Sequence, residues 1–274
     1  MNNHTPLIEL KHNRLTSQGA VFFFPGSGDS ITSFISLVNE QNHGLPVYGL
    51  QPRGLDPQQE PYVSMDEMID VYMKSICAKQ NRGPYYLLGH SFGGFIALEI
   101  ARRLHAQGCV VKSVIMLDVS PPENPHIHLS RVECLLELIQ TMELASSKPF
   151  NLTAKVLEPL SEEDQLLLLH KRMVATGVLP NRSTVDSIRG MVRVFIANEH
   201  MEYWPKEKYQ GEALLINALD KKENNVERQK QYLRWKSHVP KLGYQESPGN
   251  HITLLDSLNI KVLAEIIAKH WALS

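Results

Sequence analysis

Leu87-Leu88-Gly89-His90-Ser91-Phe92-Gly93-Gly94 is the stretch of sequence that decides the fold. Its apolar start is typical of a buried strand. A helical pattern follows directly, with apolar residues at Phe95, Ile96, Ala97, Ile100, Ala101 and Leu104. A serine on a tight strand-to-helix turn is lifted above the sheet, and its neighbours must be glycine because the backbone there is strained and crowded. The pattern predicts a nucleophile at Ser91, against the alternative of an ordinary glycine-rich turn.

Composition bounds the class of protein. Apolar residues make up 43% of the 274 residues, which suits one large core or one core with an appended subdomain. The formal net charge of −1 argues against nucleic acid or a membrane as the main partner. No apolar run is long enough to cross a bilayer, and the N-terminus has no signal-peptide pattern. Cys77, Cys109 and Cys134 have neither metal-ligand nor disulfide spacing. We therefore expect a cytoplasmic protein that binds no metal or cofactor.

Short apolar runs alternate with amphipathic helical patterns along most of the chain. The predicted strands are Ala20–Phe24, Val47–Leu50, Tyr85–Leu88, Ser113–Leu117, Ala213–Asn217 and Leu242–Gln245. Such alternation indicates strands buried on both faces and joined by helical crossovers. The sequence therefore predicts an α/β fold with a mostly parallel central sheet and helices on both faces.

The alternation breaks between about Pro121 and Pro205, where only helical patterns occur. These are Val132–Leu144, Glu162–Met173 and Thr184–Glu199. Because this insertion leaves and re-enters at the carboxyl ends of strands, where open α/β sheets bind ligands, we expect a lid. The predicted organisation is a core of residues 1–124 and 206–274 with an inserted helical lid at 125–205. A second helical domain with its own core is the alternative.

A serine hydroxyl needs a base, and the base needs a group that orients it. In this architecture the acid follows the serine and the histidine comes last. His251, in the loop before the C-terminal helix, is the predicted base. Asp118 and Asp220 both end predicted strands at the same edge of the sheet. Asp118 is favoured because it follows its strand more tightly, and Asp220 stays the alternative.

Acyl transfer also needs hydrogen-bond donors for the tetrahedral oxyanion. The backbone N–H of Phe92 lies at the predicted helix N-terminus, where the helix dipole assists. The loop Phe24-Pro25-Gly26-Ser27-Gly28 is expected to supply the second N–H, from Ser27 or Gly26. A phosphate-binding loop is the competing reading, but neither the Gly-Lys-Ser/Thr nor the full dinucleotide pattern is present.

These motifs together resemble the thioesterase domains of non-ribosomal peptide and polyketide synthases, within the α/β-hydrolase family. The resemblance rests on residues 24–28, 47–56, 83–94 and 249–251. It implies that a carrier protein presents an acyl, peptidyl or polyketide chain on its phosphopantetheine arm. Carried over by position, Ser91 accepts the chain, His251 is the general base and Asp118 orients it. Release to water or to an internal nucleophile then completes a step of secondary metabolite biosynthesis.

The resemblance includes two subfamilies. Terminal release domains usually carry the acid at the Asp118 position and a segment like Gln51-Pro52-Arg53-Gly54-Leu55, whereas stand-alone editing (type II) thioesterases place it near Asp220. The loop favours the terminal type. A generic serine ester hydrolase and a non-catalytic binding module are further alternatives. Arg53 and Lys112 are the exposed candidates for contact with the carrier or its phosphate.

Overall fold

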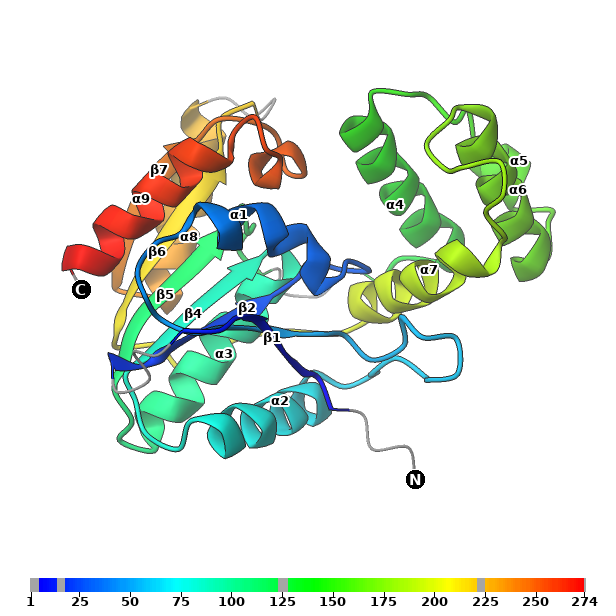
Figure 1. The fold of residues 1–274 in the computed structure, drawn as a ribbon. Coiled ribbons are helices and arrows are strands. Elements are labelled where there is room, and N and C mark those ends of the chain that lie inside the picture. The colour runs from blue at the N-terminus through cyan, green and yellow to red at the C-terminus, as the bar shows by residue number, and fades with distance from the viewer. Residues whose placement is uncertain (1–4, 14–17, 123–127, 221–224, 274) are drawn as a thin grey trace.

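The computed structural model describes residues 5–13, 18–122, 128–220 and 225–273. Its centre is a seven-stranded sheet of order β1-β3-β2-β4-β5-β6-β7 (Figure 1). The strands are β1 Leu7–Lys11, β2 Ala20–Phe24, β3 Val47–Leu50, β4 Tyr85–His90, β5 Val111–Leu117, β6 Glu212–Ala218 and β7 Lys241–Ser247. β1 pairs antiparallel with β3, and all other neighbours are parallel. The predicted α/β fold with a mostly parallel sheet is therefore confirmed; β1 was not among the predicted strands.

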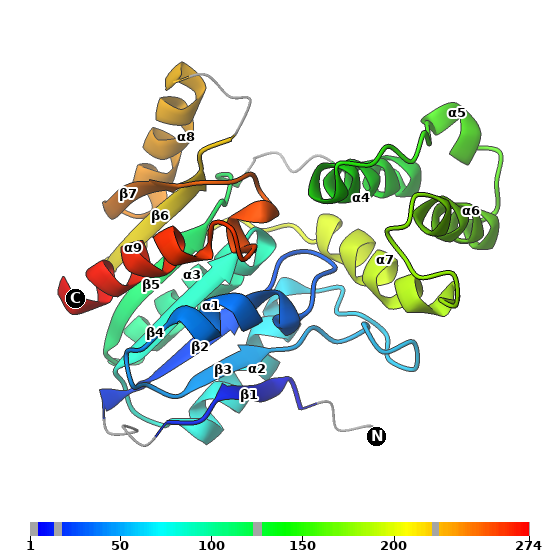
Figure 2. The same cartoon turned by 45° about the horizontal axis from the view of Figure 1, so that its top comes forward.

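Alternate residues of the central strands enter two different cores. On β2, Phe22 belongs to one core cluster and Phe23 to the other. The first cluster is covered by α2 (Met65–Lys79), α3 (Phe92–Ala106) and α8 (Asn225–His238), and the second by α1 (Ile35–Glu40) and α9 (Ile260–Leu273). Figure 2 shows α1 and α9 together on one side of the sheet. Burial on both faces explains why the strands are continuous apolar runs rather than alternating ones.

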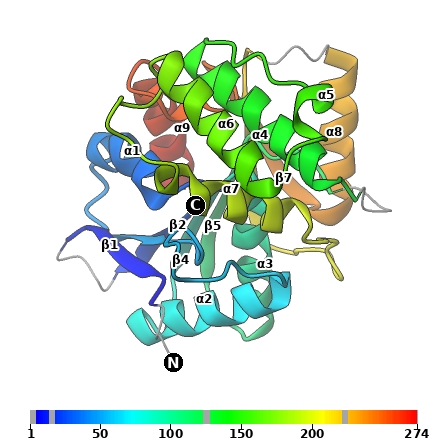
Figure 3. The ribbon, with the colours of Figure 1, turned by 90° about the vertical axis from the view of Figure 1, so that its right-hand side faces the viewer.

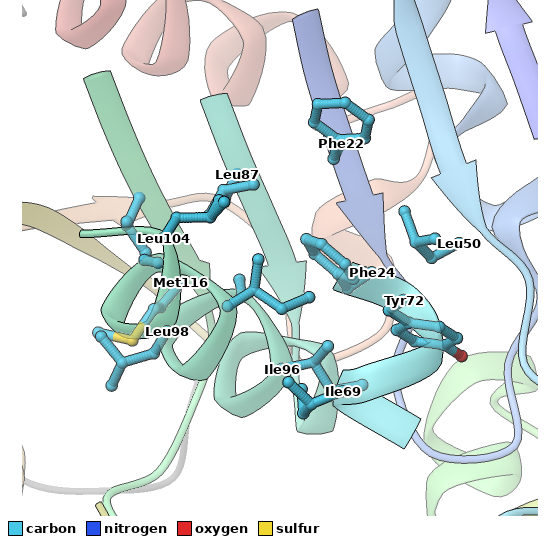
Figure 4. Close-up of a cluster of buried hydrophobic side chains, with 14 of the residues drawn as sticks. Phe22, Phe24, Leu50, Ile69, Tyr72, Leu87, Ile96, Leu98, Leu104 and Met116 are labelled. Carbon is cyan, nitrogen blue, oxygen red and sulfur yellow. The ribbon is translucent and has the colours of Figure 1, made fainter. Parts of the chain in front are cut away.

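Figure 4 shows side chains of the first core cluster, which come from β2 to β5 and from α2 and α3. Phe24 and Tyr72 stack with ring centroids 6.4 Å apart, which fixes α2 beneath β2. Ile96 and Leu104 of α3 are 3% or less exposed. Burying an aliphatic or aromatic side chain of this size contributes roughly 1.5–3 kcal/mol. The strand-to-helix turn that carries Ser91 is thus held between well-packed elements.

Side-chain caps fix where several helices begin. Ser64 Oγ accepts a hydrogen bond from Glu67 N at the start of α2. At α4 (Arg131–Ser146), Ser130 and Glu133 form a reciprocal capping box. The polar caps satisfy backbone N–H groups that have no partner inside a helix, which typically stabilises the helix by about 1 kcal/mol.

The segment between β5 and β6 contains α4, α5 (Ala154–Leu157), α6 (Glu162–Ala175) and α7 (Asp186–Glu199). These helices bury their own cluster, which includes Leu135 and Leu169. They lie together beyond one end of the sheet (Figures 1 and 3). α7 also packs on the loop after β3, since a Cβ added to Gly190 would lie 2.0 Å from the carbonyl oxygen of Leu55. The predicted boundary at residues 124 and 125 lies outside the described residues.

Candidate active site

Ser91 occupies a strained turn between β4 and α3. Its φ of 52° and ψ of −127° lie in a region that non-glycine residues rarely adopt. Glycines on both sides make the turn possible. A Cβ at Gly89 would lie 1.9 Å from the carbonyl oxygen of Gly93, and a Cβ at Gly93 would lie 2.0 Å from that of Phe24. The serine is thereby lifted to the carboxyl end of the sheet, as the sequence predicted.

Asp118 and His251 meet beside this turn, although 133 residues separate them. His251 Nδ1 donates to Asp118 Oδ2 at 2.8 Å. Asp118 Oδ1 accepts from the backbone N–H of Ala218, also at 2.8 Å, and the residue is only 3% exposed. A buried carboxylate with both oxygens bonded is held in one orientation. It keeps the proton of His251 on Nδ1 and leaves Nε2 available as a base.

The loop that carries His251 is fixed from within. Asn250 Oδ1 accepts from the backbone N–H groups of Ile252 and Thr253, at 3.0 and 2.9 Å. Thr253 Oγ1 accepts in return from Asn250 N at 2.8 Å, at the start of the 3₁₀ helix η3 (Thr253–Leu255). Asp220, the alternative acid, is exposed, and its backbone N–H bonds to the carbonyl of Gly249. The structure therefore brings Asp118, not Asp220, to the histidine.

The predicted oxyanion loop lies directly against Ser91. A Cβ added to Gly26 would be 3.2 Å from Ser91 Cβ. Gly28 has a φ of 71°, and a Cβ there would lie 2.8 Å from the carbonyl oxygen of Met191 in α7. Ser27 stands between these two contacts, and Phe92 is the first residue of α3. The residues chosen from the sequence as oxyanion donors thus flank the nucleophile from two different elements.

A cavity of about 610 Å³ opens beside Ser91 and His251. Its walls differ in character. The segment that runs from the end of β2 into α1 offers polar groups such as Asp29, Ser33 and Ser36. In contrast, α4 and α7 offer Leu138, Met142, Met191 and Phe195. Burial raises the pKa of the Asp29 carboxyl. A cavity of this size and mixed lining suits a small-molecule chain.

His90 is the site residue that sequence reasoning set aside, because the short turn was expected to point it elsewhere. It is 4% exposed, and its Nε2 lies 2.7 Å from the carbonyl oxygen of His251. The two imidazole rings are 4.8 Å apart between centroids. Burial, followed by the nearby charge of His251, lowers the pKa of His90 to about 3. Its place in the nucleophile turn was the only available signal.

Ser91 and His251 line the same cavity, yet in the described part of the chain no hydrogen bond joins Ser91 Oγ to the imidazole. Such bonds are often long without substrate and tighten in the complex. Three anchors locate the base in this state: Asp118, Asn250 and His90.

Arg53 and Lys112, the two cations considered for contact with the carrier, are not among the residues that line this cavity. Arg53 is half-buried, with its guanidinium 3.8 Å from the centroid of the Tyr62 ring and 3.3 Å from Glu67 Oε1. Lys112 is exposed but sits at the amino end of β5, opposite the catalytic edge. Arg53 thus braces the loop after β3, and Lys112 lies at the end of the sheet away from Ser91.

Among the residues that the structure describes, no helix is long and apolar enough to cross a membrane. Within the same residues, no group of three or more histidine, cysteine, aspartate or glutamate side chains is arranged to hold a metal ion.

A mostly parallel sheet with helices on both faces and a serine elbow at its carboxyl edge defines the α/β-hydrolase class. Residues 20–270 match the model of the thioesterase domain family, and the chain belongs to that family. The resemblance inferred from the sequence is therefore confirmed, and so is the expectation of a thioesterase enzyme.

Relatives and solved structures agree with this assignment. Atromentin synthetase invA1 of Paxillus involutus is 29% identical over 266 residues, which cover 92% of this chain and 27% of the relative. A four-domain non-ribosomal peptide synthetase, holo-AB3403 bound to AMP and glycine, superposes with a TM-score of 0.82 at 26% identity, covering 97% of this chain and 20% of that one. The Vlm2 thioesterase domain bound with a dodecadepsipeptide has a TM-score of 0.70 at 19% identity, with 97% of both chains covered. The chain thus spans only about a quarter of the first relative's length.

Proposed function

We propose that this chain releases an acyl, peptidyl or polyketide chain from the phosphopantetheine arm of a carrier protein, through an ester on Ser91. The observation that carries the proposal is that Ser91 and His251 line one cavity, while buried Asp118 bonds to the far side of the His251 ring. Residues 125–205 are proposed to act as the lid of that cavity, since α4 and α7 form its apolar wall.

In the proposed first half-reaction, Ser91 Oγ attacks the thioester carbonyl carbon while His251 Nε2 takes the hydroxyl proton. The carbonyl oxygen becomes an oxyanion that accepts from the backbone N–H groups of Phe92 and Ser27. Collapse of this intermediate breaks the carbon–sulfur bond, and His251 returns its proton to the departing thiol. Asp118 stabilises the imidazolium between these two transfers without taking a proton itself.

In the second half-reaction, water or a nucleophile within the bound chain attacks the ester on Ser91, with His251 again as base. Hydrolysis and cyclisation use the same residues and differ in whether water reaches the ester. The substrate arrives on the carrier's arm, so the proposal needs no cofactor held by this chain. A carrier domain as partner is supported by the synthetase relatives, of which this chain matches only a part. A cytoplasmic location stays a prediction.

A terminal release domain is favoured over a stand-alone editing enzyme. The support is the position of the acid: Asp118 bonds to His251, whereas Asp220, at the position expected for editing enzymes, is exposed. A generic serine ester hydrolase has no comparable observation in its favour.

The proposal is tested with carrier-bound acyl thioesters and Ser91→Ala. We expect turnover to fall by roughly 10⁴- to 10⁶-fold, because the nucleophile is lost while the fold is kept. Mass spectrometry of the wild-type chain should detect an acyl group on Ser91, and a fluorophosphonate probe should label the same residue. Ser27→Ala is the matched control, since Ser27 is proposed to act through its backbone N–H, which alanine retains. Full turnover by Ser91→Ala, or faster cleavage of a free ester than of the carrier thioester, would contradict the proposal.

A further inference from the structure

His90 joins the nucleophile turn to the loop of the base. It directly precedes Ser91 in the chain, and its Nε2 lies 2.7 Å from the carbonyl oxygen of His251 across 161 residues. A carbonyl oxygen can only accept a hydrogen bond, so His90 Nε2 must carry the hydrogen. The tautomer of His90 is therefore set by the main chain of the residue that acts as base.

The ring of His90 makes a second contact with the same residue. Its centroid is 4.8 Å from that of the His251 imidazole, and the ring planes are inclined by 35°. His90 consequently touches both the main chain and the side chain of His251. Asp118 bonds to the other side of that imidazole, at Nδ1. The base is held between a carboxylate and a neutral ring.

The remaining nitrogen of His90 faces the oxyanion loop. A Cβ added to Gly26 would lie 3.4 Å from His90 Nδ1, and this buried atom has no hydrogen-bond partner among the described residues. His251 and Asp118 are the titratable groups that act on the ring, and burial is the largest cause lowering its pKa to about 3. Burial therefore favours the neutral form of His90. This form keeps its Nε2–H donor and places no positive charge beside the imidazolium that His251 forms during catalysis.

We propose that His90 is a positioning residue that sets the place of His251 relative to Ser91 by donating to the His251 carbonyl and packing against its ring. The proposal rests on the proposed function, in which His251 is the base. Because the donor and the nucleophile are adjacent in the chain, a shift of the turn moves both together. The distance between nucleophile and base is then preserved when the cavity changes shape.

Two substitutions of His90 distinguish a role in positioning His251 from a role in packing alone. His90→Gln can place an amide N–H near the position of Nε2 but has no ring, whereas His90→Phe keeps an aromatic ring and has no donor. We expect His90→Phe to lower kcat about 10- to 100-fold with KM changed less than about twofold, since the unpaired His251 carbonyl lets the base move. His90→Gln should retain more activity than His90→Phe. The reverse order would identify His90 as a packing residue and overturn the proposal.

Measurements on the wild-type chain do not depend on how the variants fold. In NMR spectra near neutral pH, the ring nitrogens of His90 should show the neutral tautomer that carries its hydrogen on Nε2, which is the donor to the His251 carbonyl. A hydrogen on Nδ1 instead of Nε2 overturns the proposal. In folded variants, the proton between His251 Nδ1 and Asp118 should stay resolved in His90→Gln and broaden in His90→Phe.

Failure of this proposal and failure of the proposed function give different results. His251→Ala separates them. If it abolishes turnover while His90→Phe is fully active, only the positioning role of His90 is lost. If His251→Ala is itself active, the proposed function fails, whatever His90 does.

Discussion

The carboxyl edge of the sheet and the helical insertion build opposite walls of one cavity by different means. At the sheet edge, main-chain bonds between buried strands hold the catalytic groups: Ser91 N donates to the carbonyl of Leu117 at 2.9 Å, and Asp118 N donates to that of Ile216 at 2.8 Å. In the insertion, side chains such as Leu138 and Phe195 form the wall. Main-chain hydrogen bonds thus position the residues of the proposed chemistry. The shape of the cavity wall that faces the substrate depends instead on side chains, which can be substituted without changing the backbone.

The largest difference between the two regions should come from the acid at the sheet edge. Asp118→Asn is expected to lower kcat by up to roughly 10⁴-fold, because the amide can favour the wrong tautomer of His251. Steady-state kinetics with a carrier-bound thioester measures the loss. Asp220→Asn is the control and should stay within about twofold of the wild type, since Asp220 is exposed and makes no contact with His251 through its side chain. A larger loss of activity in Asp220→Asn than in Asp118→Asn would identify Asp220, the position typical of editing enzymes, as the acid that orients His251.

The second expected difference is in stability: a glycine substitution in the Ser91 turn should lower the free energy of unfolding more than one in the helical insertion. Gly93→Ala puts a Cβ 2.0 Å from the carbonyl oxygen of Phe24, and backbone on both sides must shift. We expect its free energy of unfolding to fall by more than about 3 kcal/mol, measured by denaturant titration. Gly177→Ala, in the insertion, has a φ of 69° but only Lys148 Nζ within 4 Å of the added Cβ, at 3.5 Å. It should cost about 1 kcal/mol. Equal costs would mean that the turn is not the more constrained region.

The smallest effect should appear in substrate choice. Met191→Ala removes a cavity-lining side chain on α7 and is expected to shift the kcat/KM ratio of longer to shorter acyl chains by about tenfold. The rate of fluorophosphonate labelling at Ser91 should stay unchanged, because the sheet edge is untouched. Val156→Ala, at an exposed position of α5 outside the cavity, is the matched control and should leave the ratio as it is. An unchanged ratio in Met191→Ala would remove α7 from chain selection.

Local signals account for most of what was predictable. Five strands were found from buried apolar runs, β7 from a weaker pattern, and α2 from its cap at Ser64 and its apolar stripe. The antiparallel strand β1 was missed because an edge strand is half-exposed, which leaves a weak apolar pattern. Ser91, Asp118 and His251 were named because strand ends and chain order limit the candidates. Arg53 was expected to be exposed and is instead half-buried, because its partners Tyr62 and Glu67 come from later in the chain.

Sequence by itself determined the elements and the elbow, because strand runs, caps and glycine requirements act over a few residues. It named two acids and favoured Asp118 over Asp220, but it could not show which of them contacts the histidine. Only the tertiary structure decided that Asp118 bonds to His251 and that His90 contacts the same residue from the other side. The physical reason is that these contacts join residues more than 130 positions apart, and their geometry depends on how neighbouring strands align and how the final loop folds back over them.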